Sequence, residues 1–285
     1  MSPSRYTRLK AIKEFGYNID WKELRKYHIG IIGVGGLGAV SSEMAARCGV
    51  GTISLFDFDT VEVVNLNRHM FKEKHIGRPK VDVAREVLQE INPDVKFQTF
   101  NHDIMDIRFE STFEKEISQM DLLLNGLDNI PAREYLNLKC IHLNVPYIDA
   151  GASRSGLSGH VHPIIPFKTA CAKCLSRIQM AIPKVRGEPC VASLPSTMAI
   201  LASIQTQEML KHLLKFGKLI DYIMYDMVSG RFLTYKTKRD PDCPACGAKA
   251  AKKGKKRRSN ADQIDTTDND LSELIDKFKK GEDED

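Results

Sequence analysis

Four of the seven cysteines form two C-x-x-C pairs, Cys171 with Cys174 and Cys243 with Cys246. Four thiolates are a ligand set for a tetrahedral structural Zn²⁺, and one ion bound by both pairs would join the start of the second half of the chain to its end. The alternative is two redox dithiols, but neither pair lies at the strand-to-helix turn where a thioredoxin-like dithiol is activated. The spacing therefore favours a structural zinc site.

Cys190 differs from the other cysteines in its surroundings. It lies in the loop sequence VRGEPCVASLPST, with Lys184 and Arg186 before it and the start of a predicted helix after it. A nearby positive charge and a helix N-terminus both favour the thiolate, which is the nucleophilic form of cysteine. We predict that Cys190 is a nucleophile carried by a loop at about residues 176–195.

A strand-like apolar run over residues 29–32 leads into four glycines, which are Gly33, Gly35, Gly36 and Gly38. Glycines let the backbone approach an anionic ligand, and the helix pattern that follows would present unpaired N–H groups and a partial positive charge to phosphate. A second apolar run ends at Asp57, about where a dinucleotide fingerprint has the acidic residue that contacts the ribose. The pattern predicts a nucleotide site and, by itself, fits NAD as well as ATP.

A polar and basic cluster follows the nucleotide pattern, with Asn65, Asn67, Arg68 and Lys80. Hydride transfer from a nicotinamide needs no cations around a third phosphate. Attack on the α-phosphorus of ATP does, because charge accumulates on the departing pyrophosphate. Asp128, in the stretch GLDN, could hold a Mg²⁺ that bridges phosphate oxygens. The cluster therefore favours ATP with Mg²⁺.

These side chains require a sheet whose strands end at one edge. Strand patterns over 29–32, 53–56, 95–100, 122–125 and 146–149 alternate with helix patterns, which implies a mostly parallel sheet with helices on both faces. Ligands of such sheets gather at the carboxyl ends of the strands. After Gly151 the pattern changes to antiparallel strands over 156–166, 222–227 and 232–236, with a long helix over 196–216. We expect an α/β, Rossmann-like fold extended by antiparallel strands.

The composition is typical of a globular enzyme, with 42% hydrophobic residues in 285. No apolar run approaches the roughly 20 residues of a spanning helix, and the first residues are too basic for a signal peptide. The odd cysteine count argues against a disulfide framework. We expect a cytoplasmic protein with no membrane partner.

The charge distribution marks a separate tail. Residues 249–258 carry seven basic side chains, whereas 259–285 carry ten acidic and three basic ones. The basic run is more typical of a solvated linker than of a nucleic-acid contact, and we expect residues 248–270 to be disordered. Residues 271–281 have apolar side chains at helical spacing, which predicts a short amphipathic helix that binds a partner or folds back on the body.

The motifs together resemble one family, the E1-type activating enzymes of ubiquitin-like modifiers, and most closely its compact members. The resemblance covers roughly residues 3–247 and rests on GVGGLG, LFDFDTVEVVNLNR, Lys80, GLDN, the two C-x-x-C pairs and CVASLPSTM. It implies an adenylation domain over 1–247 that joins the C-terminal glycine of a modifier, a β-grasp protein, to AMP. A cysteine then takes the acyl group as a thioester and passes it to an E2-like enzyme recruited by the terminal helix.

The resemblance also implies roles for individual residues. Gly36 and Asp57 would contact the nucleotide, with Asp57 on the ribose, and Asn129 would lie beside it. Arg8 would reach the site of the other protomer in a homodimer. The remaining roles are phosphate binding by Arg68 and Lys80, Mg²⁺ binding by Asp128, the thioester at Cys190, and zinc at Cys171, Cys174, Cys243 and Cys246.

Three alternatives differ in what they predict. A bacterial sulfur-carrier adenylyltransferase of the MoeB or ThiF type would exchange pyrophosphate but would not need Cys190 for transfer to an E2. A non-catalytic scaffold would not exchange pyrophosphate at all. An NAD dehydrogenase would leave Arg68, Lys80 and the paired cysteines without a task.

Overall fold

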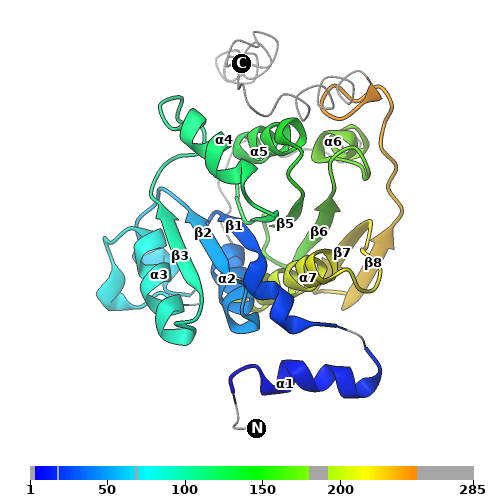
Figure 1. The fold of residues 1–285 in the computed structure, drawn as a ribbon. Coiled ribbons are helices and arrows are strands. Elements are labelled where there is room, and N and C mark those ends of the chain that lie inside the picture. Colours follow the sequence, from blue (N-terminus) through cyan, green and yellow to red (C-terminus); the bar gives the residue numbers. More distant parts are fainter. Residues whose placement is uncertain (1–3, 18, 68–69, 180–191, 249–285) are drawn as a thin grey trace.

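A computed structural model describes residues 4–17, 19–67, 70–179 and 192–248 (Figure 1). In this part of the chain the strands form one sheet in the order β3-β2-β1-β4-β5-β6-β7-β8. The strands are β1 (His28–Ile32), β2 (Thr52–Phe56), β3 (Lys96–Phe100), β4 (Leu122–Asn125), β5 (Tyr147–Ala152), β6 (Ser158–Ile164), β7 (Tyr222–Asp226) and β8 (Arg231–Tyr235). The pairs from β3 to β5 are parallel and those from β5 to β8 are antiparallel, as the sequence predicts.

Helices cover both faces of this sheet (Figure 1). One face is packed by α2 (Gly36–Cys48), α3 (Lys80–Ile91) and α7 (Pro195–Leu214), and the other by α4 (Glu110–Ser118), α5 (Ile130–Leu143) and α6 (Ala172–Gln179). Shorter helical pieces are α1 (Thr7–Lys10) and the 3₁₀ segments Ala11–Phe15, Trp21–Lys26, Val63–Asn65 and Glu73–His75. Among the described helices, none has the length and apolar character needed to cross a membrane.

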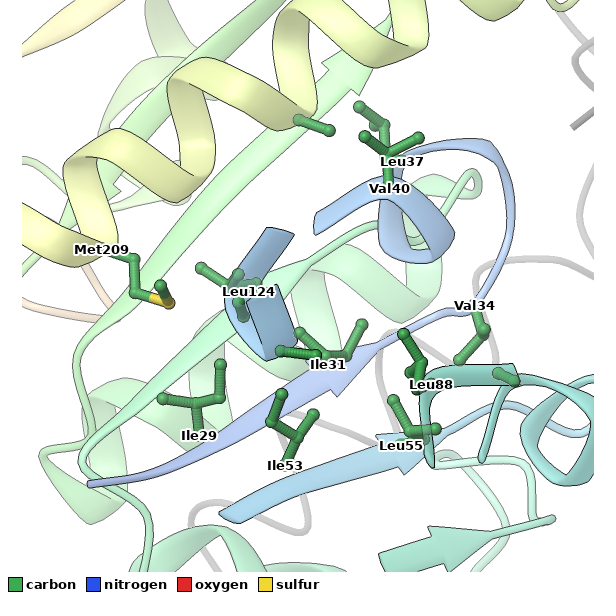
Figure 2. Close-up of a cluster of buried hydrophobic side chains, with 14 of the residues drawn as sticks. Ile29, Ile31, Val34, Leu37, Val40, Ile53, Leu55, Leu88, Leu124 and Met209 are labelled. Atoms are coloured by element: carbon green, nitrogen blue, oxygen red, sulfur yellow. The ribbon is translucent and has the colours of Figure 1, made fainter. Parts of the chain in front are cut away.

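Successive side chains of a strand point to opposite faces of the sheet. In the central strands the side chains on both faces are apolar, because helices cover both faces. Ile29 and Ile31 of β1 belong to the core under α2 and α7, whereas Ile32 belongs to the core under α4 and α5. Figure 2 shows the first core, where Ile31 and Leu124 lie among side chains of the sheet and the helices above it. Because both faces of these strands are buried, each strand is fixed in its position within the sheet. The loops that follow the carboxyl ends of the strands are therefore fixed as well.

The described structure departs from the sequence prediction after Cys174. A polar loop is expected from about residue 176, but residues 176–179 are helical because α6 continues to Gln179. β8 is the last strand of the sheet, at the opposite side from β3. It is exposed along its whole length, including Phe232, Leu233 and Tyr235. Its neighbour within the described part of the chain is β7 alone.

Candidate active site and metal centre

The glycine-rich loop joins the carboxyl end of β1 to the start of α2. Gly33 has φ +86°, and a Cβ on Gly38 would lie 1.8 Å from the carbonyl oxygen of Gly33. The helix N-cap is Gly35, and no side chain caps the first turn of α2. Its unpaired N–H groups are therefore available to an anion, as the sequence predicts for a phosphate loop.

Asp57 follows β2 and is bonded to this loop. Its Oδ2 accepts from the backbone N of Val34 at 2.6 Å, and its Oδ1 accepts from the N of Asp59 at 2.9 Å. Burial raises the pKa of Asp57, and the charge of Lys80 and the two backbone bonds oppose this effect. The carboxylate thus shapes the loop, while its contact with a ribose stays a prediction.

Lys80 is brought to the same edge by a pairing of chain segments. Thr60 forms an antiparallel bridge with Pro79, and the backbone N of Lys80 donates to the carbonyl of Asp59 at 2.9 Å. Its side chain is only 10% exposed and its Nζ lies 2.6 Å from Asp59 Oδ2. An ammonium group has three donors, so Lys80 can hold Asp59 and still offer hydrogen bonds to a phosphate.

The two asparagines of the predicted phosphate cluster have structural partners. Asn65 is buried, and its Oδ1 accepts from the backbone N of Glu62 at 3.0 Å as a cap of the 3₁₀ turn. Asn67 donates through Nδ2 to the carbonyl of Ser193 at 3.0 Å. The second contact joins the nucleotide side of the sheet to the end of the segment predicted to carry the nucleophile. Arg68 and Cys190 lie outside the described residues.

Asp128 and Asn129 follow the carboxyl end of β4, and both are exposed. Asn129 caps α5, because its Oδ1 accepts from the backbone N of Ala132 at 2.9 Å. The turn lies against the glycine loop, since a Cβ on Gly33 would meet the backbone of Gly126 and Leu127 at 3.0 to 3.1 Å. The glycine loop, Asp57, Lys80 and the Asp128 turn therefore share one edge of the sheet.

A buried polar cluster behind this turn is missing from the sequence prediction. Asp149 of β5 accepts from Asn125, Arg133 and His160 at 2.6, 2.8 and 2.9 Å. Burial alone would raise the pKa of Asp149, but the Arg133 charge and the His160 hydrogen bond outweigh it and hold that pKa well below its ordinary value. The one sequence signal was an acidic residue at the end of a buried strand.

Arg8 lies on α1 and is exposed. The segment around it packs at the edge where the parallel strands begin, because Arg5 bonds to the carbonyl of Ile91 and Tyr6 to Asn92 and Asp94. Figure 1 shows α1 apart from the carboxyl ends of the strands. Arg8 is thus remote from the glycine loop of its own chain.

The paired cysteines form one cluster, and all four are buried. Neighbouring sulfurs are 3.8 Å apart for Cys171 and Cys174, 3.7 Å for Cys171 and Cys243, and 3.4 Å for Cys174 and Cys246. A Zn–S bond of about 2.3 Å places tetrahedral sulfurs about 3.8 Å apart, so the set fits zinc. Hydrogen bonds within the cluster lower the pKa of Cys174 and Cys243 and raise that of Cys171 and Cys246. Without a cation, the thiolate form is therefore favoured at two of the four sulfurs, and a bound metal would favour it at all four.

Comparison with protein families agrees with this fold. Residues 6–245 match the model of the ThiF family, and the chain belongs to that family. Among its relatives are ubiquitin-like modifier-activating enzyme 5 of Mus musculus, 38% identical over 252 residues, and that of Dictyostelium discoideum, 37% identical over 251.

These alignments cover 84% of this chain but 62% and 66% of the two relatives, so the chain spans less than two thirds of their length. Among solved structures, E. coli MccB with ATP has a TM-score of 0.74 and 24% identity over 86% of this chain and 75% of MccB. At 24% identity, this structural similarity shows a shared fold and nothing further.

Proposed function

We propose that the protein is an E1-like enzyme that adenylates the C-terminal glycine of a ubiquitin-like modifier and captures the acyl group on Cys190. The observation that carries the proposal is the meeting of the glycine loop, Lys80 and the Asp128 turn at one edge, in a chain 38% identical to a modifier-activating enzyme. Hydride transfer by a dehydrogenase would not require the Lys80 ammonium group beside the glycine loop.

The first step is attack of the glycine carboxylate on the α-phosphorus of ATP. A P–O bond forms to the carboxylate oxygen, the bond to the β-phosphate oxygen breaks, and pyrophosphate leaves. In the proposal the N–H groups of Gly35, Gly36 and Gly38 and the Lys80 ammonium bind the phosphates, since preorganised donors stabilise the developing charge. Arg68 joins them, and Asp57 accepts from the ribose.

Asp128 would hold Mg²⁺ at the phosphates, and Asn129 and Asn67 would lie beside the nucleotide. The ion would supply positive charge that offsets the charge developing on the phosphates. The donor set fits it, because Asp128 is an exposed carboxylate on a turn that touches the glycine loop.

The second step is attack of the Cys190 thiolate on the acyl carbon, which releases AMP and leaves a thioester. Support comes from the contact of Asn67 with Ser193, which follows Cys190 by three residues. This contact anchors the end of the cysteine segment at the edge that holds the nucleotide.

The remaining parts of the proposal concern the metal and the partners. We assign a structural Zn²⁺ to Cys171, Cys174, Cys243 and Cys246 and an adenylation domain to residues 1–247. The charged linker over 248–270 and the helix over 271–281 would recruit an E2-like enzyme, and residues from 249 on lie outside the described structure. Arg8 would act in the site of a second copy, in a cytoplasmic homodimer.

The test is capture of a modifier in the presence of Mg²⁺ and ATP. Candidate β-grasp proteins that end in glycine are incubated with the protein, and a thiol-sensitive adduct is followed on non-reducing gels. Cys190→Ala should abolish the adduct while ATP–pyrophosphate exchange continues. Cys48→Ala is the matched control, because burial raises the pKa of the Cys48 thiol to about 11 and makes it a poor nucleophile.

Other outcomes separate the alternatives. An adduct that survives Cys190→Ala reassigns the nucleophile. Pyrophosphate exchange that a sulfur-carrier protein supports, but none of the ubiquitin-like modifiers supports, would favour the sulfur-carrier adenylyltransferase instead. If no carrier protein supports exchange, the remaining alternative is a non-catalytic scaffold that binds nucleotide.

A further inference from the structure

Arg133 connects three separate segments behind the candidate active site. Its Nε donates to the carbonyl of Leu127 at 2.8 Å, its Nη1 to Asp149 Oδ1 at 2.8 Å, and its Nη2 to the carbonyl of Ala150 at 2.6 Å. Its side chain is 17% exposed. The planar guanidinium therefore joins α5, from which it projects, to β5 and to the turn that carries Asp128.

The guanidinium is itself held in place. Asn125 donates to the same Oδ1 of Asp149 as Arg133, and His160 bonds to Oδ2. The His160 ring stacks on Tyr222 with centroids 5.4 Å apart. A Cβ on Gly151 would lie 2.7 Å from Arg133 Nη2, so the strand leaves room for one position of the group. The Asp149 carboxylate that binds the Arg133 guanidinium is thus held in a fixed position.

Among the described residues, the turn makes few other hydrogen bonds. Gly126 donates to the carbonyl of Ile32 at 2.8 Å and Leu127 donates to Asn125 Oδ1 at 3.1 Å. After Leu127 the next bonds are those of the α5 cap at Asn129. The bond from Arg133 to the Leu127 carbonyl is therefore the contact that fixes the peptide leading into Asp128.

We propose that Arg133 is a positioning residue, which sets the Leu127–Asn129 turn so that the Asp128 carboxylate faces a metal–nucleotide complex on the glycine loop. This inference rests on the proposed adenylation function for its ligand, but the geometry it describes belongs to the protein alone. Residues that orient a metal-binding carboxylate without touching the metal typically change metal affinity about 10- to 100-fold when they are replaced.

The first measurement is amide hydrogen exchange without nucleotide. Arg133→Lys keeps the charge but cannot reach Leu127 and Asp149 with one planar fork. Exchange in peptides covering 125–130 should rise about tenfold, since one charge-assisted hydrogen bond is lost. Arg108→Lys is the matched control. Arg108 makes the same kind of fork on Asp106, but its side chain is 87% exposed.

The second measurement is the affinity for α,β-methylene ATP with and without Mg²⁺, by calorimetry. Wild type should bind more tightly with Mg²⁺. In Arg133→Lys this gain should shrink about tenfold while binding without Mg²⁺ stays near the wild-type value. Asp149→Asn, which loosens the base of the fork, should have the same effect and serves if Arg133→Lys does not fold.

The outcomes are distinguishable. Unchanged exchange in 125–130, or equal losses with and without Mg²⁺, would overturn the positioning role. If wild type gains nothing from Mg²⁺, the assignment of Asp128 in the proposed function fails, and the exchange measurement alone then decides whether Arg133 fixes the turn.

Discussion

Gly38 has no room for a side chain, because its Cβ would lie 1.8 Å from the carbonyl oxygen of Gly33. Gly38→Ala must push the phosphate loop away from α2. We expect a loss of about 3 kcal/mol in the free energy of unfolding, as in other overpacked sites, together with loss of ATP binding. Urea unfolding and calorimetry measure the two effects.

Gly35 provides the comparison for stability. A Cβ there would have nothing within 4 Å, and its φ is −85°. Gly35→Ala should therefore leave the free energy of unfolding within about 0.5 kcal/mol of the wild-type value. Equal losses in the two variants would show that the close approach of Gly38 to Gly33 does not limit the loop.

His162 makes stability depend on pH. It is 1% exposed, its Nε2 has no partner among the described residues, and burial lowers its pKa to about 4. Below the ordinary pKa of about 6.5, the unfolded chain takes up a proton that the folded chain refuses, so stability falls as the pH falls. Relative to His162→Phe, wild type should lose on the order of 2 kcal/mol between pH 7 and pH 5.

Urea unfolding of both proteins at the two pH values measures this difference. Because only the change with pH is compared, any packing cost of phenylalanine cancels. A constant difference between wild type and variant would mean that His162 takes up its proton as readily in the folded protein as in the unfolded chain.

Residue types and spacing predicted the glycine loop, Lys80 and the Asp128 turn, because each follows a recognisable strand or opens a helix. They did not predict the cluster around Arg133 and Asp149. Its members come from four elements, β4, α5, β5 and β6, and side-chain hydrogen bonds between distant segments leave no periodic signal in the sequence. The same reason explains Asn65, which was grouped with the phosphate ligands but caps a turn.

At the level of elements, the order of strands and helices was predictable because period-2 and period-3.6 patterns are strong in a doubly covered sheet. The boundary of α6 was not, because the short sequence from 176 to 179 carries no capping or helix-breaking residue that would mark where the helix ends. The cysteine cluster was predictable from its pairs, although they lie at the start of α6 and in the segment after β8.

In the proposed zinc site, this joining of distant elements would make the metal a stability determinant. Cys174→Ser should reduce bound zinc from one per chain to nearly none and lower the melting temperature on the order of 10 °C. Mass spectrometry of the metal and a thermal scan test both expectations. Cys140→Ser is the control, since the buried Cys140 of α5 is outside the cluster and its replacement should leave the zinc content unchanged.

At the level of the whole molecule, α1 with Arg8 lies away from the glycine loop of its own chain, so the proposed role of Arg8 depends on the proposed homodimer. Arg8→Ala and Asp128→Asn should each lose pyrophosphate exchange. Co-expressed with two different tags and purified through both, they form dimers in which one of the two sites has every residue, so about half of the wild-type activity should return. No recovery in such mixed dimers would assign Arg8 to its own chain or to no site.

The exposure of β8 has a consequence for the behaviour of the protein in solution. An outer strand with free N–H and C=O groups is a template for another strand, and its aromatic side chains add to that tendency. Arg231 begins the strand and Lys236 and Lys238 follow it, all three exposed, so two such strands brought together would repel each other electrostatically. Salt screens this repulsion, and concentrated preparations should stay monodisperse at low ionic strength and self-associate as salt is added.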